Sequence, residues 1–135
     1  MNEINRKLNA VTEWEKMQEA LKEAKALLEK EMPSGSISRA YYAAFHAGKA
    51  LLLTEGVEIR SHQALGRFFS LHFVKTGRFD VQFSRILSKA QKYREEADYN
   101  SEFVFRMEDA HERFREVSEF IKVIEAHLKK EGYLK

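Results

Sequence analysis

Four polar side chains recur along one stretch of the chain with the spacing of an α-helix: Arg39, Tyr42, His46 and Lys49. Side chains three or four residues apart share one face of a helix, so these four form a single ridge. A guanidinium can hold a phosphate, a phenol can stack on a base, and an imidazole can move a proton near neutral pH. The ridge therefore predicts a cleft or a dimer interface that binds a nucleotide or RNA. The alternative is that the ridge is the solvent-exposed face of an ordinary helix.

A second cluster of reactive side chains lies near residue 96, with Arg94, Asp98 and Tyr99 close together in the sequence. Arg94 and Asp98 are four residues apart and can form an ion pair on one helix face. We expect these three side chains to join the ridge in one ligand-binding site. The alternative is structural: the pair sets the register between helices, with Arg39 as a cross-helix partner of Asp98.

Positive charge is concentrated in the middle of the chain, although the whole chain has a net charge of only +2. From residue 60 to residue 94 the only acid is Asp80, against eight basic residues: Arg60, Arg67, Lys75, Arg78, Arg85, Lys89, Lys92 and Arg94. Such an excess of positive charge attracts anions such as phosphate. The alternative is that these residues form an ordinary solvent-exposed surface.

The composition limits the class of protein. The 135 residues suit one domain, residues 1–135, and the chain has no cysteine, which excludes disulfides and thiolate metal sites. We see no apolar run of ~20 residues and no apolar leader at the start, so we expect a cytoplasmic protein without a membrane segment. The remaining histidines are scattered, and we expect neither a metal site nor a cofactor: His62, His72, His111 and His127.

The elements that must position these side chains are helices. Apolar residues recur every three or four positions, and the single proline, Pro33, precedes the ridge. The pattern predicts an all-α fold, a four- to five-helix up-and-down bundle. We expect helices over residues 2–32 with a break near Thr12, 37–54, 61–76, 80–99 and 107–128, with a turn and cap at 33–36 and a polar break at 100–102.

Three of these helices have distinctive faces. The first carries an apolar stripe: Ile4, Leu8, Val11, Trp14, Met17, Leu21, Ala24 and Leu28. The second has so many small residues on its apolar face that neighbouring backbones can approach closely. The last has a seam for a neighbouring helix: Met107, Ala110, Phe114, Val117, Ile121, Ile124 and Leu128. This seam either packs inside the bundle, which we favour, or joins two copies.

The stretch Ser38-Arg39-Ala40-Tyr41-Tyr42-Ala43-Ala44-Phe45-His46-Ala47, followed by Ser61-His62 and by Arg94 to Tyr99, resembles the HEPN domain family. The resemblance spans residues from about 36 to 100. It implies a helical bundle that commonly dimerises, and small prokaryotic members of this kind are often paired with a minimal nucleotidyltransferase as a toxin and antitoxin. Many members resemble metal-independent ribonucleases with an Arg and a His a few residues apart.

Three hypotheses follow. In the first, the chain is a nucleotide- or RNA-binding module that acts as a homodimer, with a minimal nucleotidyltransferase as its partner. In the second, it is a metal-independent endoribonuclease with His46 and Arg39 as catalytic residues, or with Arg94 and Asp98 as a degenerate motif in which Asp replaces His. The low ordinary pKa of Asp, about 3.9, makes it a poor acid near neutral pH. In the third, the chain is purely a structural partner subunit.

Overall fold

The computed structural model of the protein describes residues 2–100 and 102–135, and these residues form helices and connecting segments without a strand. The helices are α1 (Glu3–Glu29), α2 (Pro33–Leu53), α3 (His62–Phe69), the π-helix η1 (Ser70–Val74), α4 (Gln82–Tyr99) and α5 (Met107–Lys130). The predicted all-α bundle is therefore confirmed. Ser101, in the predicted break at 100–102, lies outside the described residues.

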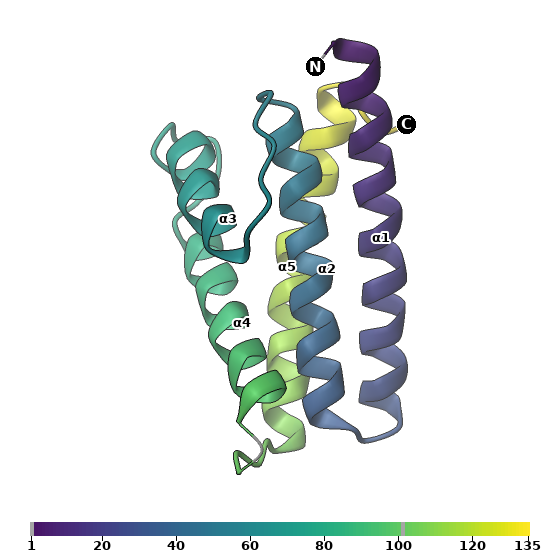
Figure 1. Ribbon diagram of the computed structural model, residues 1–135, viewed down its shortest axis with the longest axis vertical. Coiled ribbons are helices and arrows are strands. Elements are labelled where there is room, and N and C mark those ends of the chain that lie inside the picture. The colour runs from purple at the N-terminus through teal and green to yellow at the C-terminus, as the bar shows by residue number, and fades with distance from the viewer. Residues whose placement is uncertain (1, 101) are drawn as a thin grey trace.

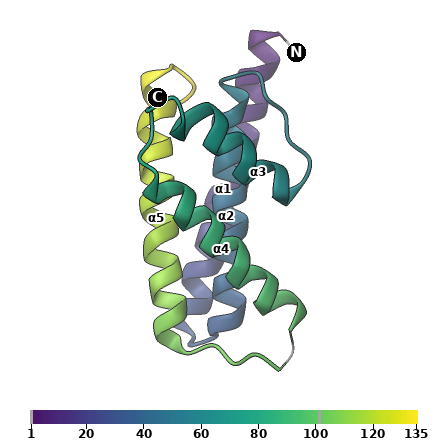
Figure 2. The ribbon, with the colours of Figure 1, turned by 90° about the vertical axis from the view of Figure 1, so that its left-hand side faces the viewer.

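The long helices α1, α2 and α5 run side by side, with both ends of the chain at the same end of the bundle (Figure 1). Helix α4 crosses them obliquely, and the short α3 lies across their upper part (Figure 2). Helix α2 is central because it packs against α1, α5, α4 and α3. Any site beside α2 is consequently built from several parts of the chain.

Helix α1 differs from the prediction in two ways. It continues through Thr12 without a break, and the Thr12 hydroxyl donates to the Leu8 carbonyl one turn earlier in the helix. The first part of the predicted apolar stripe is not buried: Ile4 is 71% exposed, Leu8 61% and Val11 37%. The tip of α1 extends past the neighbouring helices (Figure 1), but Ala10, between Leu8 and Val11, is 2% exposed and part of the core. Leu8 and Val11 are therefore exposed because they lie on a different side of the helix from its buried face.

The turn between the first two helices is shorter than predicted. Helix α2 begins at Pro33 rather than near Ile37, since proline fits the first helical position, where its missing N–H would have no partner. Ser36 is therefore not a cap but a buried residue of α2, and its hydroxyl donates to the Ala24 carbonyl of α1 at 2.8 Å. This hydrogen bond ties the two helices together where their backbones run close.

Gly48 allows α3 to pack directly on α2. A β-carbon at this position would lie 2.5 Å from Cδ1 of Leu65, a fully buried residue of α3. Ser61 caps α3 as predicted, because its hydroxyl accepts from the Ala64 amide. Asp80, which was expected to cap the fourth helix, lies one residue before the N-cap of α4, Val81, and its carboxylate accepts from the Gln82 amide in the preceding turn. The packing at Gly48 and the cap at Ser61 together set the position of His62, the first residue of α3.

Helix α5 confirms that the last seam packs inside the bundle. Val117, Ile124 and Leu128 are completely buried, and α5 packs mainly against α2. Phe120 also enters the core, where its ring meets that of Phe69 edge-on. The seam is thus used within one chain.

Candidate functional site

A cleft of about 660 Å³ lies between the start of α3 and the second half of α4. Its walls combine two guanidinium groups, an imidazole, side-chain amides, a phenol and two carboxylates. The lining residues are Arg60, Ser61, His62, Gln63, Gln91, Arg94, Glu95, Glu96, Tyr99 and Asn100. Of the seven predicted site residues, Arg94 and Tyr99 are in this wall.

Arg94 is the most unusual group in the cleft, because it is a charged residue that is only 5% exposed. Its guanidinium lies 5.1 Å from the centre of the Tyr41 ring and 5.7 Å from that of Tyr99. The carboxylate of Asp98 is 3.7 Å from Nη1, which confirms the predicted pair but exceeds hydrogen-bond distance. The buried Nε has no hydrogen-bond partner among the described residues. Arg94 is therefore a buried cation that is incompletely paired.

His62 shares the cleft with Arg94. Its Nδ1 lies 3.0 Å from the Tyr41 hydroxyl, and its ring packs 4.3 Å from that of Phe45. Burial lowers the pKa of His62, and the charge of Arg94 lowers it further. His62 is therefore mostly neutral at neutral pH. His62 was not among the predicted site residues, because only the packing of α3 on α2 brings this histidine beside Arg94.

The predicted ridge on α2 forms a strip beside the cleft rather than part of its wall. All four ridge residues are half-buried, as expected for a strip between two neighbouring helices. The Arg39 guanidinium stacks 4.5 Å from the centre of the Tyr42 ring, which in turn meets the His62 ring edge-on at 5.8 Å. Tyr42 and His62 thus connect the strip to the cleft. The catalytic roles predicted for Arg39 and His46 stay predictions.

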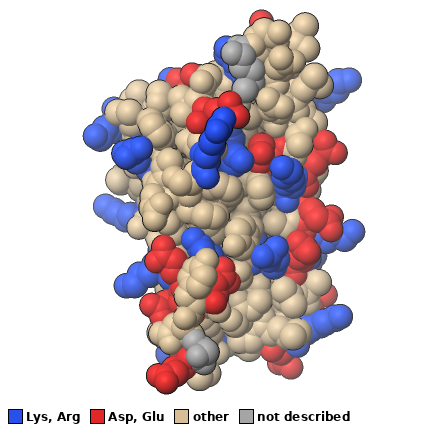
Figure 3. Space-filling view, viewed as in Figure 1, with Lys and Arg blue, Asp and Glu red and all other residues tan. Residues whose placement is uncertain are grey.

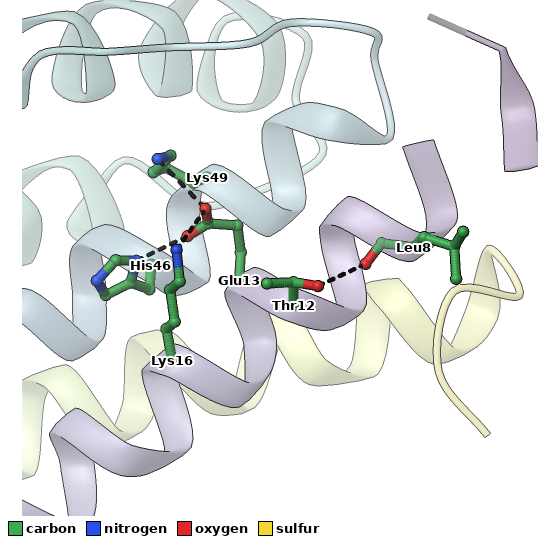
Figure 4. Close-up of polar contacts among 6 residues, drawn as sticks. All are labelled: Leu8, Thr12, Glu13, Lys16, His46 and Lys49. Atoms are coloured by element: carbon green, nitrogen blue, oxygen red, sulfur yellow. Dashed lines mark hydrogen bonds and ion pairs between the residues drawn. The ribbon is translucent and has the colours of Figure 1, made fainter. Parts of the chain in front are cut away.

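The other end of the ridge is paired with Glu13, a residue of α1 that the sequence analysis did not select. Its carboxylate is 2.7 Å from Nδ1 of His46, 3.3 Å from Nζ of Lys49 and 3.8 Å from Nζ of Lys16 (Figure 4). Burial alone would raise the pKa of Glu13, but the hydrogen bond with His46 and the charge of Lys49 outweigh it. The pKa of Glu13 consequently lies below its usual value.

Asp98 has a structural partner on α2, although not the predicted one. The Ser38 hydroxyl donates to Oδ1 of Asp98 at 2.7 Å, whereas Arg39 stacks on Tyr42 instead. Asp98 therefore joins α2 to α4 while it faces Arg94. Tyr99, at 77% exposure, stands at the mouth of the cleft and is free to contact a ligand.

The basic span does not form one continuous unpaired surface. Arg78 pairs with Glu55 at 2.6 Å and Lys89 with Glu112 at 3.7 Å, in addition to the pair at Arg94. Basic side chains recur along the left-hand edge of Figure 3, the side of α3 and α4, but acidic side chains lie among them. This surface therefore presents individual basic groups such as Arg94 rather than a uniform positive field.

Two other kinds of site are absent from the part of the chain that the structure describes. No helix in this part of the chain is both long and apolar enough to cross a membrane. Within residues 2–100 and 102–135, no three acidic or histidine side chains lie close enough together to hold a metal ion.

Comparison with known proteins shows a match to the HEPN domain over residues 11–127. Two similar proteins of Methanocaldococcus jannaschii are named "Putative toxin MJ0605" and "Putative toxin MJ0142". The first is 38% identical over 63% of this chain and 63% of its own length, the second 32% over 71% and 65%. A UPF0332 protein of Thermotoga maritima is 29% identical over 90% of this chain and 93% of its own length. The chain thus spans slightly less than two thirds of the two toxin-named relatives.

Proposed function

Because this chain belongs to the HEPN domain family, we propose that it is a toxin-like HEPN module that binds a phosphate group of a nucleotide or RNA in the cleft between α3 and α4. The observation that carries this proposal is Arg94 in the wall of an open cleft: its side chain is buried, and its Nε has no hydrogen-bond partner among the described residues.

The energetics of Arg94 favour an anionic ligand. A buried charge is costly unless it is paired and hydrogen-bonded, and the 3.7 Å separation from Asp98 meets that need only in part. The Nε atom is sealed from solvent, so a phosphate oxygen in the cleft would accept a charge-assisted hydrogen bond from the terminal nitrogens of the guanidinium. Arg60 and Gln63 line the same cleft and offer further donors, while Tyr99 offers a ring for a base to stack on.

We extend the proposal to the assembly in which the module acts. The family resemblance implies a homodimer that works with a minimal nucleotidyltransferase as a toxin–antitoxin pair, and the names of the two Methanocaldococcus relatives support a toxin. Light scattering on the purified chain tests the dimer, and a monomer at micromolar concentration contradicts it. Co-expression with the nucleotidyltransferase encoded nearest to this gene tests the pair, and separate elution of the two proteins contradicts it.

Binding is tested with fluorescent oligoribonucleotides and with ATP at 50 and 300 mM salt, by fluorescence anisotropy. We expect Arg94→Gln to weaken binding at least tenfold, since a charge-assisted hydrogen bond contributes about 1.5–3 kcal/mol. The matched control is Arg85→Gln, an exposed arginine of α4 outside the cleft, which should stay within twofold.

Because Arg94 is buried, circular dichroism must first show that the Arg94→Gln variant is folded. If it is not, Arg60→Gln at the cleft replaces it, with an expected loss of about threefold. Binding that is absent even at 50 mM salt, or equal in the cleft variants and the control, overturns the proposal.

A metal-independent ribonuclease is the second candidate, and the Glu13–His46 pair favours it. A carboxylate on Nδ1 orients an imidazole so that Nε2 can act as a general base. In this reaction His46 would take the proton of a ribose 2′-hydroxyl, whose oxygen bonds to phosphorus. The bond to the 5′-oxygen breaks, and that oxygen leaves with a proton from solvent.

The test for cleavage is incubation of RNA with the protein in EDTA, with mass spectrometry for 2′,3′-cyclic phosphate ends. His46→Ala should abolish this product, whereas His111→Ala, an exposed histidine of α5, should not change it. Full activity in His46→Ala, or no cleavage by the unmodified chain, excludes this mechanism and leaves the binding module.

A further inference from the structure

Two histidines from different helices lie around one aromatic ring. The centre of the Phe45 ring is 5.5 Å from that of His46 and 4.3 Å from that of His62, so the two imidazoles are at most about 10 Å apart. In each imidazole the Nδ1 atom is occupied by a partner from another helix: Glu13 for His46 and Tyr41 for His62. The free edge of each ring is therefore its Nε2 side.

Glu13 determines which nitrogen of neutral His46 carries the proton. An ionised carboxylate can only accept hydrogen bonds, so at 2.7 Å the Nδ1 of His46 must be the donor. The lysines around Glu13 keep it ionised. In its neutral form, His46 then has no proton on Nε2, which is an acceptor. In Figure 4, this second ring nitrogen lies on the side of the ring away from Glu13.

Tyr41 determines the opposite arrangement in His62. The Tyr41 hydroxyl is completely buried, and His62 Nδ1 is the one acceptor that the described residues offer it. The neighbouring polar group is the Arg94 guanidinium, which can only donate. If Nδ1 carried the proton of neutral His62, the phenol proton would be buried without a partner, at a cost of about 1–3 kcal/mol. The phenol therefore donates to Nδ1, and the proton of His62 lies on Nε2.

We propose that Glu13 and Tyr41 hold these two histidines in opposite tautomers, so that beside Phe45 the ring of His46 offers an acceptor at Nε2 and the ring of His62 offers a donor. This rests on the proposed function, in which a phosphate occupies the cleft at Arg94. His62 lines the same cleft, so His62 Nε2–H and Arg94 then both donate to phosphate oxygens.

The tautomers are tested without any ligand, by long-range ¹H–¹⁵N correlation spectra of the ¹⁵N-labelled protein at pH 8. We expect the unprotonated nitrogen of His46 to be Nε2 and that of His62 to be Nδ1, with signals assigned from His46→Gln and His62→Gln. Tyr41→Phe should release His62 into a mixture of tautomers. Tyr42→Phe is the matched control, since this ring also meets His62 but gives it no hydrogen bond. The same tautomer in both histidines overturns the proposal.

The donor role of His62 is tested by the binding of an oligoribonucleotide to the intact protein. One hydrogen bond corresponds to about a three- to tenfold difference in affinity. We expect His62→Ala to weaken binding by this factor and His111→Ala to leave it unchanged. Equal binding by the two variants overturns the role of His62 while the proposed function stands. No binding by the unmodified protein overturns the proposed function, and the tautomer spectra still decide the roles of Glu13 and Tyr41.

Discussion

Replacement of Gly48 by alanine probes the contact that positions α3 and hence His62. The new methyl group would lie 2.5 Å from Cδ1 and 3.3 Å from Cδ2 of Leu65, a side chain with no exposed surface into which it could move. Overpacking of this kind costs about 1–3 kcal/mol. Alanine also raises helix propensity by up to about 1 kcal/mol, which offsets part of that cost.

Gly66 provides the matched control for this prediction. It lies inside α3, and a β-carbon there would meet nothing within 4 Å, so Gly66→Ala has the gain in propensity without the clash. We expect Gly48→Ala to be about 1–3 kcal/mol less stable than Gly66→Ala, or about 4 °C lower in Tm for each kcal/mol. Urea unfolding followed by the fluorescence of Trp14, the single and buried tryptophan, measures both variants.

The stabilities of the two alanine variants can refute the described packing of α3 on α2. If both alanine variants are equally stabilised, then α3 does not pack on Gly48 as described and the position of His62 relative to Arg94 is wrong as well. If Gly48→Ala is destabilised, its His62 should also show a weakened hydrogen bond to Tyr41 in the spectra described above.

Three other perturbations test the remaining packing and charges. The pKa of Glu13 is below its ordinary value of 4.5 in the fold, so its ion pairs stabilise the chain above that pH and are lost as the pH falls through the folded pKa. Urea unfolding between pH 6 and pH 3 should therefore show a larger loss of unfolding free energy for the natural chain than for Glu13→Gln. Parallel plots of unfolding free energy against pH would contradict this. Arg113 is 2% exposed and pairs with Glu112 and Glu116. Arg113→Ala should lower the unfolding free energy by about 3 kcal/mol, because it breaks a buried ion pair. The double variant Arg113→Leu with Glu116→Leu should recover most of that stability in thermal melts. Ile4→Asn and Leu8→Asn should each change the unfolding free energy by less than about 0.5 kcal/mol, since both residues are exposed; a loss above about 2 kcal/mol would place them in the core.

The fold was largely predictable because helical periodicity is a local property. The three- and four-residue steps from Met107 to Leu128 define a buried seam whatever lies opposite, and the structure uses it as predicted. The same reasoning was wrong for Ile4 and Leu8, since steps of three and four residues drift around a helix and Leu8 lies nearly opposite Ala10, which is buried. The start of α2 at Pro33 was also missed, although proline at a first helical position is a known signal.

The candidate site was predictable only in its parts. The ridge on α2 and the Arg94–Asp98 pair follow from spacing within one helix, and both are present. Ser38 as the partner of Asp98, and Glu13 as the partner of His46, could not be found this way. These pairs join residues 60 and 33 positions apart, and their contact depends on how far each helix is rotated about its axis.

Sequence alone thus determined the helices of this protein, their buried faces apart from the first part of α1, and the residue types available for phosphate chemistry, because those properties depend on neighbours within a few positions. Tertiary structure alone decided that His62 rather than His46 lies beside Arg94, and that Tyr41 and Glu13 occupy one nitrogen of each imidazole. The physical reason is the close approach of α3 to α2 at Gly48 and of α1 to α2 at Ser36, which sets distances that periodicity does not contain.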